Sequence, residues 1–221
     1  RIAGVAVRTP LVSCAVPTGR PESLLVKPES LQPVGSFKLR GAYNKLASLD
    51  PESRGRGVVA SSSGNHAQAV AYVARKFGIK ATIVIPEGAA ETKIAATRGY
   101  GADVLLVPPD QRDTKPLELA AEHGYALVPP YDDPAVIAGT GTIGAEIAAD
   151  LPDVDLVLVP VSGGGLISGI ATAVKIRCPQ ARVVGVEPEL AADAAESFRR
   201  GERVEWSPEL TFRTAADGLR V

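Results

Sequence analysis

Lys38 is the side chain of this sequence that is best placed to work as an amine catalyst. It lies in the octet 35–42 (GSFKLRGA), with the aromatic Phe37 directly before it. Two residues that interrupt regular secondary structure, Pro33 and Gly35, lie upstream. An amine can act as a nucleophile or a base only after it loses its proton, so it needs surroundings that disfavour the ammonium. This octet therefore predicts a reactive lysine.

The residues after Lys38 predict a helix whose first turn contains the lysine. Leu39, Tyr43 and Leu46 recur at i, i+4 and i+7, which makes one apolar helical face. Lys38 would then lie in the first turn, where exposed N–H groups and the positive end of the helix dipole disfavour an ammonium. Taken alone, the residue could also be an ordinary solvated lysine.

A second segment, Ser61–His66 (SSSGNH), joins a short apolar run at 57–60 to another helical pattern. Small hydroxyl residues, a glycine and an asparagine at a strand-to-helix junction present several N–H and O–H donors to one anion. An ordinary Ser or Asn helix cap is the alternative interpretation.

A third segment is a glycine loop. The apolar run 156–160 predicts a buried strand, Gly163–Gly165 follow it, and a helical pattern begins at Leu166. Consecutive glycines let the backbone approach a ligand closely, and a helix N-terminus favours negative charge. The segment therefore predicts a phosphate-binding loop.

The same glycines admit a dinucleotide interpretation. Gly163, Gly165 and Gly169 approximate the dinucleotide fingerprint, and Glu187 follows about twenty residues later, where a ribose-binding acid is expected. However, the spacing is GxGxxxG rather than GxGxxG, and this interpretation gives Lys38 no role. One amine, one polar loop and one phosphate loop suit a singly phosphorylated aldehyde better, which is a description of pyridoxal phosphate.

Several long motifs, in the same order along nearly the whole chain, resemble the serine/threonine dehydratase and serine racemase family of fold-type II pyridoxal-phosphate enzymes. The matching stretches are 36–42 (SFKLRGA), 63–68 (SGNHAQ), 136–142 (VIAGTGT), 163–169 (GGGLISG), 185–188 (GVEP) and 216–218 (ADG). The resemblance implies an α/β, two-lobed fold like that of the tryptophan synthase β subunit, with mainly parallel sheets flanked by helices. It divides the chain into a large lobe, 1–50 and 135–221, and a small inserted lobe, 57–130, with the cofactor in the cleft between them.

The resemblance also implies residue roles. Lys38 would bind the cofactor aldehyde covalently and later act as the base at the substrate Cα. Phe37 would pack against the pyridine ring, and Asn65 would hydrogen-bond its hydroxyl group. The remaining implied contacts are the phosphate loop, with Ser162, Gly163, Gly164, Gly165 and Leu166, and the substrate carboxylate site, with Ser62, Ser63 and His66. Ser162 stands where the family usually has another glycine, so the phosphate loop can be slightly altered.

The implied reaction is elimination of water from L-threonine or L-serine, which yields a 2-oxo acid and ammonia. A serine racemase is an alternative, with Ser63 as the second acid/base opposite Lys38, whereas Val221 stands where racemases tend to carry a serine. A 3-hydroxyaspartate dehydratase and a non-catalytic truncated relative are further alternatives. The resemblance also implies a homodimer or a higher homo-oligomer.

A magnesium or calcium site is implied for part of this family. Glu187, the backbone carbonyl of Ala191 and Asp193 match its spacing of 0, +4 and +6. Oxygen ligands that include two carboxylates suit a hard divalent cation. The alternative is that Glu187 ends a strand and Asp193 lies on a solvated helix face.

Composition sets the limits on function. The chain has 221 residues, 45% of them apolar, and a net charge of −1. These values predict a soluble enzyme with no basic field for nucleic acid, and no apolar run approaches the roughly 20 residues of a membrane helix. Two cysteines without metal spacing, Cys14 and Cys178, suggest a reduced cytoplasmic setting.

Apolar runs at 57–61, 81–85, 103–107, 126–128, 156–160 and 182–187 predict strands that alternate with helices, which favours parallel sheets. The chain contains no methionine and stops just after the motif at 216–218. Members of the family continue further, so we expect the residue that contacts the pyridine nitrogen to lie outside this sequence.

Overall fold

A computed structural model describes residues 1–15 and 24–219 of the chain. It divides into two compact units, Arg1–Pro130 and Tyr131–Val221. The helices and strands of the first unit are β1 (Val12–Cys14), β2 (Leu24–Val26), η1 (Glu29–Leu31), α1 (Lys38–Ser48), α2 (Pro51–Arg56), β3 (Val58–Ser61), α3 (Asn65–Phe77), β4 (Ala81–Pro86), α4 (Glu91–Gly99), β5 (Asp103–Val107), η2 (Pro109–Gln111), α5 (Lys115–His123) and β6 (Ala126–Leu127).

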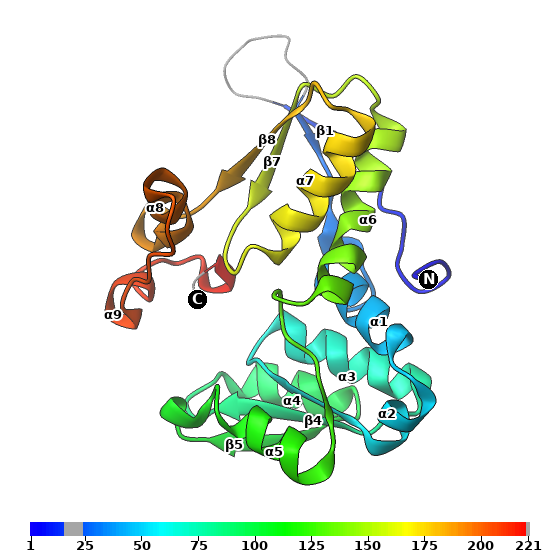
Figure 1. The fold of residues 1–221 in the computed structure, drawn as a ribbon, viewed down its shortest axis with the longest axis vertical. Coiled ribbons are helices and arrows are strands. Elements are labelled where there is room, and N and C mark those ends of the chain that lie inside the picture. The colour runs from blue at the N-terminus through cyan, green and yellow to red at the C-terminus, as the bar shows by residue number, and fades with distance from the viewer. Residues whose placement is uncertain (16–23, 220–221) are drawn as a thin grey trace. The chain divides into compact units, whose positions relative to one another are not determined.

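The first unit is built on a four-stranded parallel sheet with the strand order β5-β4-β3-β6. Figure 1 labels β4 and β5 of this sheet. The sequence predicted these four strands, and the structure confirms each of them to within one residue at either end. Their near-continuous apolar sequences suit a parallel sheet, because helices cover both of its faces.

Alternate residues of the strands enter two different cores. On one face, Val58, Ala60 and Ile83 join the larger core, which α1, α3 and α4 complete. On the other face, Val59 and Val84 pack with partly buried residues of α5. The strand period of two thus distributes one apolar run between two helical layers.

Helix α1 packs directly on α3 within the first unit. Leu39 and Leu46 of α1 are fully buried, as the apolar period predicted, whereas Tyr43, the third residue of that period, is half-buried. The rings of Tyr43 and Phe77 lie with their centroids 5.1 Å apart. The helix that carries Lys38 is therefore fixed to the helix that follows the polar loop.

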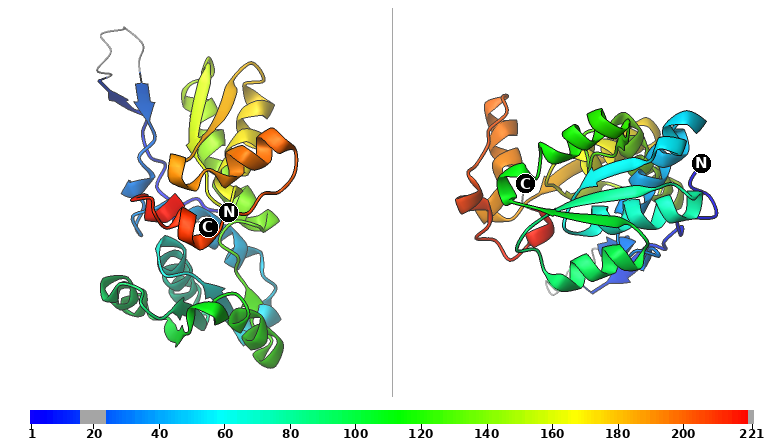
Figure 2. Two further views of the ribbon diagram at one scale, coloured as in Figure 1. Left: turned by 90° about the vertical axis from the view of Figure 1, so that its left-hand side faces the viewer. Right: turned by 90° about the horizontal axis from the view of Figure 1, so that it is seen from below.

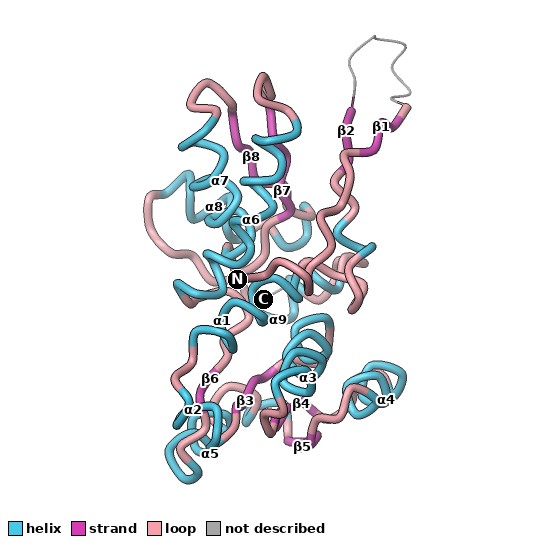
Figure 3. Tube along the Cα trace, turned by 90° about the vertical axis from the view of Figure 1, so that its right-hand side faces the viewer, coloured by secondary structure: helices cyan, strands magenta, loops and turns pink. Residues whose placement is uncertain are grey.

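The N-terminal part of the first unit contains a structure that the sequence did not predict. Strands β1 and β2 form an antiparallel pair, with Val12 opposite Val26 (Figure 3). The runs are only three residues long, and their exposure is high, so they carry neither a clear alternation nor a long apolar stretch.

The second unit contains one parallel strand pair and a tightly packed helix pair. Its elements are α6 (Pro134–Asp150), β7 (Leu156–Pro160), α7 (Gly165–Arg177), β8 (Arg182–Val186), η3 (Glu189–Ala191), α8 (Asp193–Arg200), α9 (Pro208–Thr211) and η4 (Asp217–Leu219). Strands β7 and β8 lie side by side (Figure 2), with Leu156 opposite Arg182. Both were predicted, and β8 ends one residue earlier than expected.

Helices α6 and α7 approach each other closely because glycines lie at their contact. A Cβ atom on Gly169 would come within 2.4 Å of the Ile137 carbonyl oxygen, and one on Gly144 within 2.6 Å of the Ile170 carbonyl oxygen. Real Cβ contacts are not this short, so any side chain at either position would push the helices apart.

The α/β fold class with parallel sheets flanked by helices is confirmed. The predicted lobe division, 1–50 with 135–221 against 57–130, stays a prediction. In the described residues, 1–15 and 24–219, no helix is both long and apolar enough to cross a membrane.

Candidate active site

Lys38 is the first residue of α1 and so lies in its first turn, as predicted. A turn from Gln32 to Gly35 precedes it, closed by the Gly35 amide donating to the Gln32 carbonyl at 2.7 Å. Gly35 has a φ of +70°, which favours glycine. The Lys38 Nζ donates to the Pro130 carbonyl at 2.7 Å and lies 5.2 Å from the centroid of the Phe37 ring.

Burial gives this amine its reactivity. Desolvation lowers the pKa of the Lys38 ammonium from its usual value to about 8. At pH 7 roughly a tenth of such amines are neutral, against fewer than about one in a thousand for an exposed lysine. Lys38 can therefore act as a nucleophile or a base near neutral pH, whereas a solvated surface lysine could not.

A buried ion pair holds the start of α1 in place. Arg40, with no exposed side-chain surface, binds Glu29 through Nε at 2.8 Å and through Nη2 at 2.8 Å. Arg40 Nη2 also donates to the Val7 carbonyl at 3.0 Å, and Gln32 donates to Glu29 at 3.1 Å. Removing one member would leave a buried charge uncompensated, so the network favours a single position for the first turn.

Sequence reasoning quoted Arg40 only as part of a motif and did not assign it this role. Arg40 follows Leu39 by one position, which is about 100° around the helix and at the border of the predicted apolar face, so no local pattern marks it as buried. Its partner, Glu29, belongs to a separate short helix, η1.

The polar loop joins β3 to α3, as expected from the sequence. Ser62 Oγ accepts a hydrogen bond from the Gly64 amide at 3.1 Å. The N-cap of α3 is Gly64, and no side chain of the described residues makes a capping hydrogen bond there. The interpretation of this segment as an ordinary Ser or Asn cap is therefore wrong. Asn65 is exposed at the first helical position, and Ser62 and Ser63 are half-buried.

His66 is buried, and its ring contacts the main chain. Its Nε2 lies 2.8 Å from the Val128 carbonyl oxygen. Since a carbonyl can only accept, Nε2 carries the proton and Nδ1 is an acceptor. Nδ1 is buried and has no hydrogen-bond partner among the described residues. Burial, and to a smaller extent the charge of Lys38, lowers the pKa of His66 to about 3.

The structure therefore brings together Lys38, Phe37 and His66 around the segment that follows β6. Val128 accepts from His66 and Pro130 accepts from Lys38. A substrate-binding role of the His66 side chain stays a prediction, as do the roles assigned to Phe37, Asn65, Ser62 and Ser63.

The glycine loop lies in the second unit, between β7 and α7. Gly164 is the N-cap of α7 with a φ of +81°, and no described side chain caps that helix. A Cβ atom on Gly164 would meet no described atom within 4 Å. Ser162, Gly163, Gly164 and Leu166 are partly exposed, so backbone amides at this helix start are accessible to an anion.

The other two glycines of the loop contact Tyr131. A Cβ atom on Gly163 would lie 2.3 Å from the tyrosine Cδ1, and one on Gly165 would lie 2.7 Å from the tyrosine carbonyl oxygen. Sequence reasoning missed Tyr131, because nothing in the spacing of the chain links this residue to a loop 32 positions later.

The donor set of these residues fits pyridoxal phosphate. A desolvated amine suits an aldehyde, and uncapped helix starts with open space at a glycine suit an anionic phosphate. The acid that the dinucleotide alternative needs is already engaged within the protein. Both Glu187 carboxylate oxygens accept hydrogen bonds from amides at the start of α8.

The expected metal ligands lie together in sequence but already have internal contacts. Glu187 Oε2 accepts from the Ala195 amide at 2.7 Å, and Ala191 is fully buried in η3. Burial is the largest cause of a raised pKa at Glu187, and the charge of Asp193 also raises it. Within 1–15 and 24–219, no cluster of three or more His, Cys, Asp or Glu residues could hold a metal ion. The smaller set of two carboxylates and one carbonyl stays a prediction.

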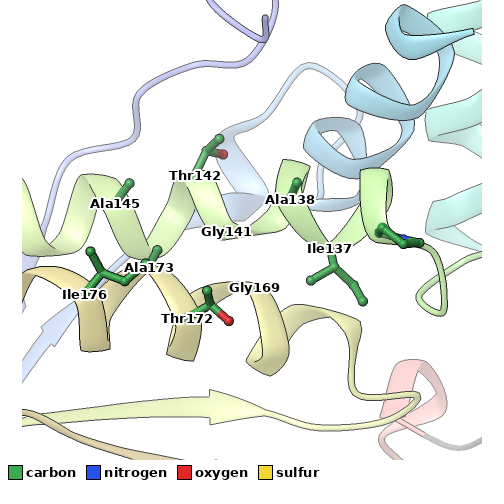
Figure 4. A pocket seen from close by; sticks show the side chains of 10 residues that line it. Ile137, Ala138, Gly141, Thr142, Ala145, Gly169, Thr172, Ala173 and Ile176 are labelled. Atoms are coloured by element: carbon green, nitrogen blue, oxygen red, sulfur yellow. The ribbon is translucent and has the colours of Figure 1, made fainter. Parts of the chain in front are cut away.

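An apolar groove runs along α6 and α7 (Figure 4). Its lining residues are Pro134, Ile137, Ala138, Gly141, Thr142, Ala145, Gly169, Thr172, Ala173 and Ile176. None of them is charged, and none has a titratable side chain. A groove without such groups is a poor candidate for acid–base chemistry.

Comparisons with protein families and known proteins identify the family of this chain. A family model described as "Pyridoxal-phosphate dependent enzyme" matches residues 2–221. The L-threonine ammonia-lyase of Thermotoga maritima is 51% identical over 202 residues, which are 90% of this chain and 49% of that protein. The L-threo-3-hydroxyaspartate ammonia-lyase of Saccharomyces cerevisiae is 46% identical over 197 residues, 88% of this chain and 60% of that protein.

Among solved structures, maize serine racemase matches with a TM-score of 0.92 and 38% identity, over 99% of this chain and 67% of that one. The chain spans only about half of the Thermotoga relative and less than two thirds of the yeast relative.

Proposed function

Because the chain belongs to the family of pyridoxal-phosphate dependent enzymes, as its motifs predicted, we propose that it eliminates water from a β-hydroxy amino acid. The products are a 2-oxo acid and ammonia, and L-threonine or L-serine is the substrate. The observation that carries this proposal is the buried Lys38 amine, with its pKa lowered to about 8, at the start of a rigidly held helix.

Relatives support the substrate class. Two similar proteins are named as ammonia-lyases, one for L-threonine and one for L-threo-3-hydroxyaspartate. Both substrates are β-hydroxy amino acids, which differ in the group attached to the β-carbon. We propose threonine or serine first, and 3-hydroxyaspartate as the alternative within the same reaction.

The proposal assigns residues as follows. Lys38 binds the cofactor aldehyde, Phe37 packs on the ring and Asn65 donates to its hydroxyl group. The glycine loop, with Ser162 and Leu166 at its ends, binds the phosphate. Ser62, Ser63 and His66 surround the substrate carboxylate, and the N-terminus of α3 supports them, since a helix start favours an anion.

The cofactor supplies the electron-accepting ring that acidifies the Cα–H bond of the bound amino acid. Once the substrate amine has replaced it on the aldehyde, Lys38 Nζ would remove the Cα proton, which requires the neutral amine that burial favours. The β-hydroxyl would leave as water with a proton from a nearby acid. The Pro130 carbonyl, 2.7 Å from Nζ, accepts a hydrogen bond from the amine and orients it. His66 stays neutral above about pH 3, so it adds no positive charge near Lys38.

A racemase is the second candidate, and a half-buried Ser63 beside the α3 start favours it. Ser63 Oγ would return a proton to the face of Cα opposite Lys38. The similarity to maize serine racemase supports this alternative. Val221, which counts against it, lies outside the described residues.

The wider proposal is a cytoplasmic enzyme that acts on a small hydroxy amino acid as a homodimer or larger homo-oligomer. We propose two lobes for it, one of residues 57–130 and one of residues 1–50 and 135–221. A magnesium or calcium ion at Glu187, Ala191 and Asp193 would be structural. A cation there would stabilise the Glu187 carboxylate, whose pKa is raised chiefly by burial and also by the charge of Asp193.

The test measures 2-oxo acid release from L-threonine, L-serine and L-threo-3-hydroxyaspartate, together with D-serine formation from L-serine. Reduction of the cofactor-loaded protein with borohydride, followed by peptide mass spectrometry, should locate the cofactor on Lys38. Lys76→Ala, which removes an exposed lysine of α3, is the control. The proposal fails if Lys38→Ala and Lys76→Ala give the same cofactor spectrum, or if no substrate releases oxo acid.

A further inference from the structure

Tyr131 lies against the glycine loop, and at two of the three glycines it leaves no room for a side chain. A Cβ atom on Gly163 would come within 2.3 Å of Cδ1, 2.4 Å of Cε1 and 2.4 Å of Cγ of the Tyr131 ring. These three atoms form one edge of the ring, so the ring packs directly on the Gly163 backbone. The φ of Gly163 is not in the left-handed region. Its requirement for glycine is therefore steric, and it comes from Tyr131.

Gly165 meets the backbone of the same residue. A Cβ atom there would lie 2.7 Å from the Tyr131 carbonyl oxygen and 2.8 Å from its Cα and its Cβ. The Gly165 carbonyl also accepts from Thr140 Oγ1 at 3.0 Å. Gly164, between these two contacts, has open space around it. The loop is thus held at both ends and exposed in the middle.

Tyr131 is itself fixed to the start of α6. The Asp133 amide donates to the Tyr131 carbonyl at 3.1 Å. Asp133 Oδ1 in turn caps α6, accepting from the Ala135 amide at 2.8 Å and the Val136 amide at 3.0 Å. Helix α6 packs tightly on α7 through glycines (Figure 4). These hydrogen bonds therefore join Tyr131 to the helix that contacts α7.

We propose that Tyr131 is a positioning residue that holds the loop 163–165 in the conformation that binds the cofactor phosphate. This inference rests on the proposed function, since it concerns the same phosphate. Three glycines in a row would otherwise be among the most mobile backbones, and ordering them on binding would cost affinity. The ring removes that cost because it orders the loop before the anion arrives.

The test compares two ligands that differ only in the phosphate. Dissociation constants of pyridoxal phosphate and of pyridoxal are measured by absorbance titration for wild type, Tyr131→Phe, Tyr131→Leu and Tyr131→Ala. We expect wild type to prefer pyridoxal phosphate strongly, and Tyr131→Ala to lose about tenfold of that preference. Tyr131→Phe, which keeps the ring, should stay within about threefold of wild type.

Tyr131→Leu keeps apolar bulk without a planar ring and serves if Tyr131→Ala does not fold. Its preference should fall between those of Tyr131→Phe and Tyr131→Ala. An unchanged ratio in both Tyr131→Ala and Tyr131→Leu would overturn the inference. An equal loss of affinity for both ligands would also overturn it, since that result would mean that the substitution damages the whole site and not phosphate binding. Wild type without any preference for the phosphate would instead contradict the proposed function.

A double-mutant cycle tests the contact itself. Gly163→Ala should weaken pyridoxal-phosphate binding by about tenfold in wild type, because the new Cβ displaces the ring. In a Tyr131→Ala background the same change should cost less than about threefold. If the loss of affinity is equal in both backgrounds, the ligand and not the Tyr131 ring requires a glycine at position 163.

Discussion

The helix starts of α3 and α7 differ in the groups that surround them. Both follow a parallel strand, and both have a glycine N-cap without a side-chain cap from the described residues. At α3 the donors are side chains, and a buried His66 joins the helix to the Val128 carbonyl. At α7 the donors are backbone amides, and Tyr131 packs on the loop.

The difference follows from what each start would bind. Side-chain hydroxyl and amide groups can be aimed at particular atoms of a ring or a carboxylate, which is useful for selecting a substrate. Backbone amides at a helix start offer a general anion site that needs only close approach. Under the proposed function, the first unit would supply the directional contacts to ring and substrate, and the second unit would anchor the phosphate.

The largest expected effect is the loss of the amine. Lys38→Arg keeps a positive charge but cannot lose its proton, since the pKa of a guanidinium exceeds about 12. We expect oxo-acid release to fall by at least about 10³-fold, while the glycine loop still binds the phosphate noncovalently. Steady-state kinetics and equilibrium dialysis of the cofactor measure the two effects. Retained turnover would show that the directional chemistry lies elsewhere.

The second effect concerns the packing of α6 on α7, the helix that follows the glycine loop. Gly169→Val should destabilise the protein by about 1–3 kcal/mol, because the side chain would overlap the Ile137 carbonyl and Thr140. Urea denaturation gives the free energy of unfolding. Gly55→Val is the matched control, since a Cβ atom at Gly55 meets no described atom within 4 Å. Equal losses for the two variants would contradict close α6–α7 packing.

The third effect concerns the hydrogen bond between His66, at the start of α3, and the Val128 carbonyl. His66→Leu leaves the buried Val128 carbonyl without its donor and should cost about 1–3 kcal/mol at pH 7. His66→Gln can donate from its amide nitrogen and should recover most of this loss. If both variants lose the same amount, the hydrogen bond contributes little.

His66 also predicts a pH dependence of stability. Its pKa is about 3 in the folded protein, against about 6.5 in the unfolded chain. The unfolded state therefore binds an extra proton between these values, and the protein loses up to about 1.4 kcal/mol per pH unit as the pH falls through this window. His66→Gln should flatten this part of the stability curve in urea titrations at several pH values. An unchanged slope would contradict a buried neutral imidazole.

The smallest expected effect on elimination comes from Ser63. Ser63→Ala should abolish any serine racemisation but reduce oxo-acid release by less than about tenfold, because elimination needs a base on only one face. Chiral chromatography of serine and a 2-oxo acid assay on the same sample separate the two. Equal loss of both activities would mean that Ser63 binds substrate and has no face-specific role.

Local patterns in the sequence predicted much of this protein. The six parallel strands, the place of Lys38 in the first turn of α1 and the two strand-to-helix loops follow from short-range periods and breaks. These features depend on residues within a few positions of each other, so a single sequence contains them. The family motifs belong to the same class of information, and the family is confirmed.

Only the tertiary structure decided how the reactive groups are surrounded. The acceptor of Lys38 lies 92 positions away at Pro130, and His66 bonds to a carbonyl 62 positions away. The expectation that Gly163 and Gly165 bind a phosphate stays a prediction, and only the structure shows that Tyr131 packs on both of them and that Gly169 packs against α6. Burial, which lowers the pKa of both Lys38 and His66, is a property of packing between distant segments, and no local period in the chain encodes it.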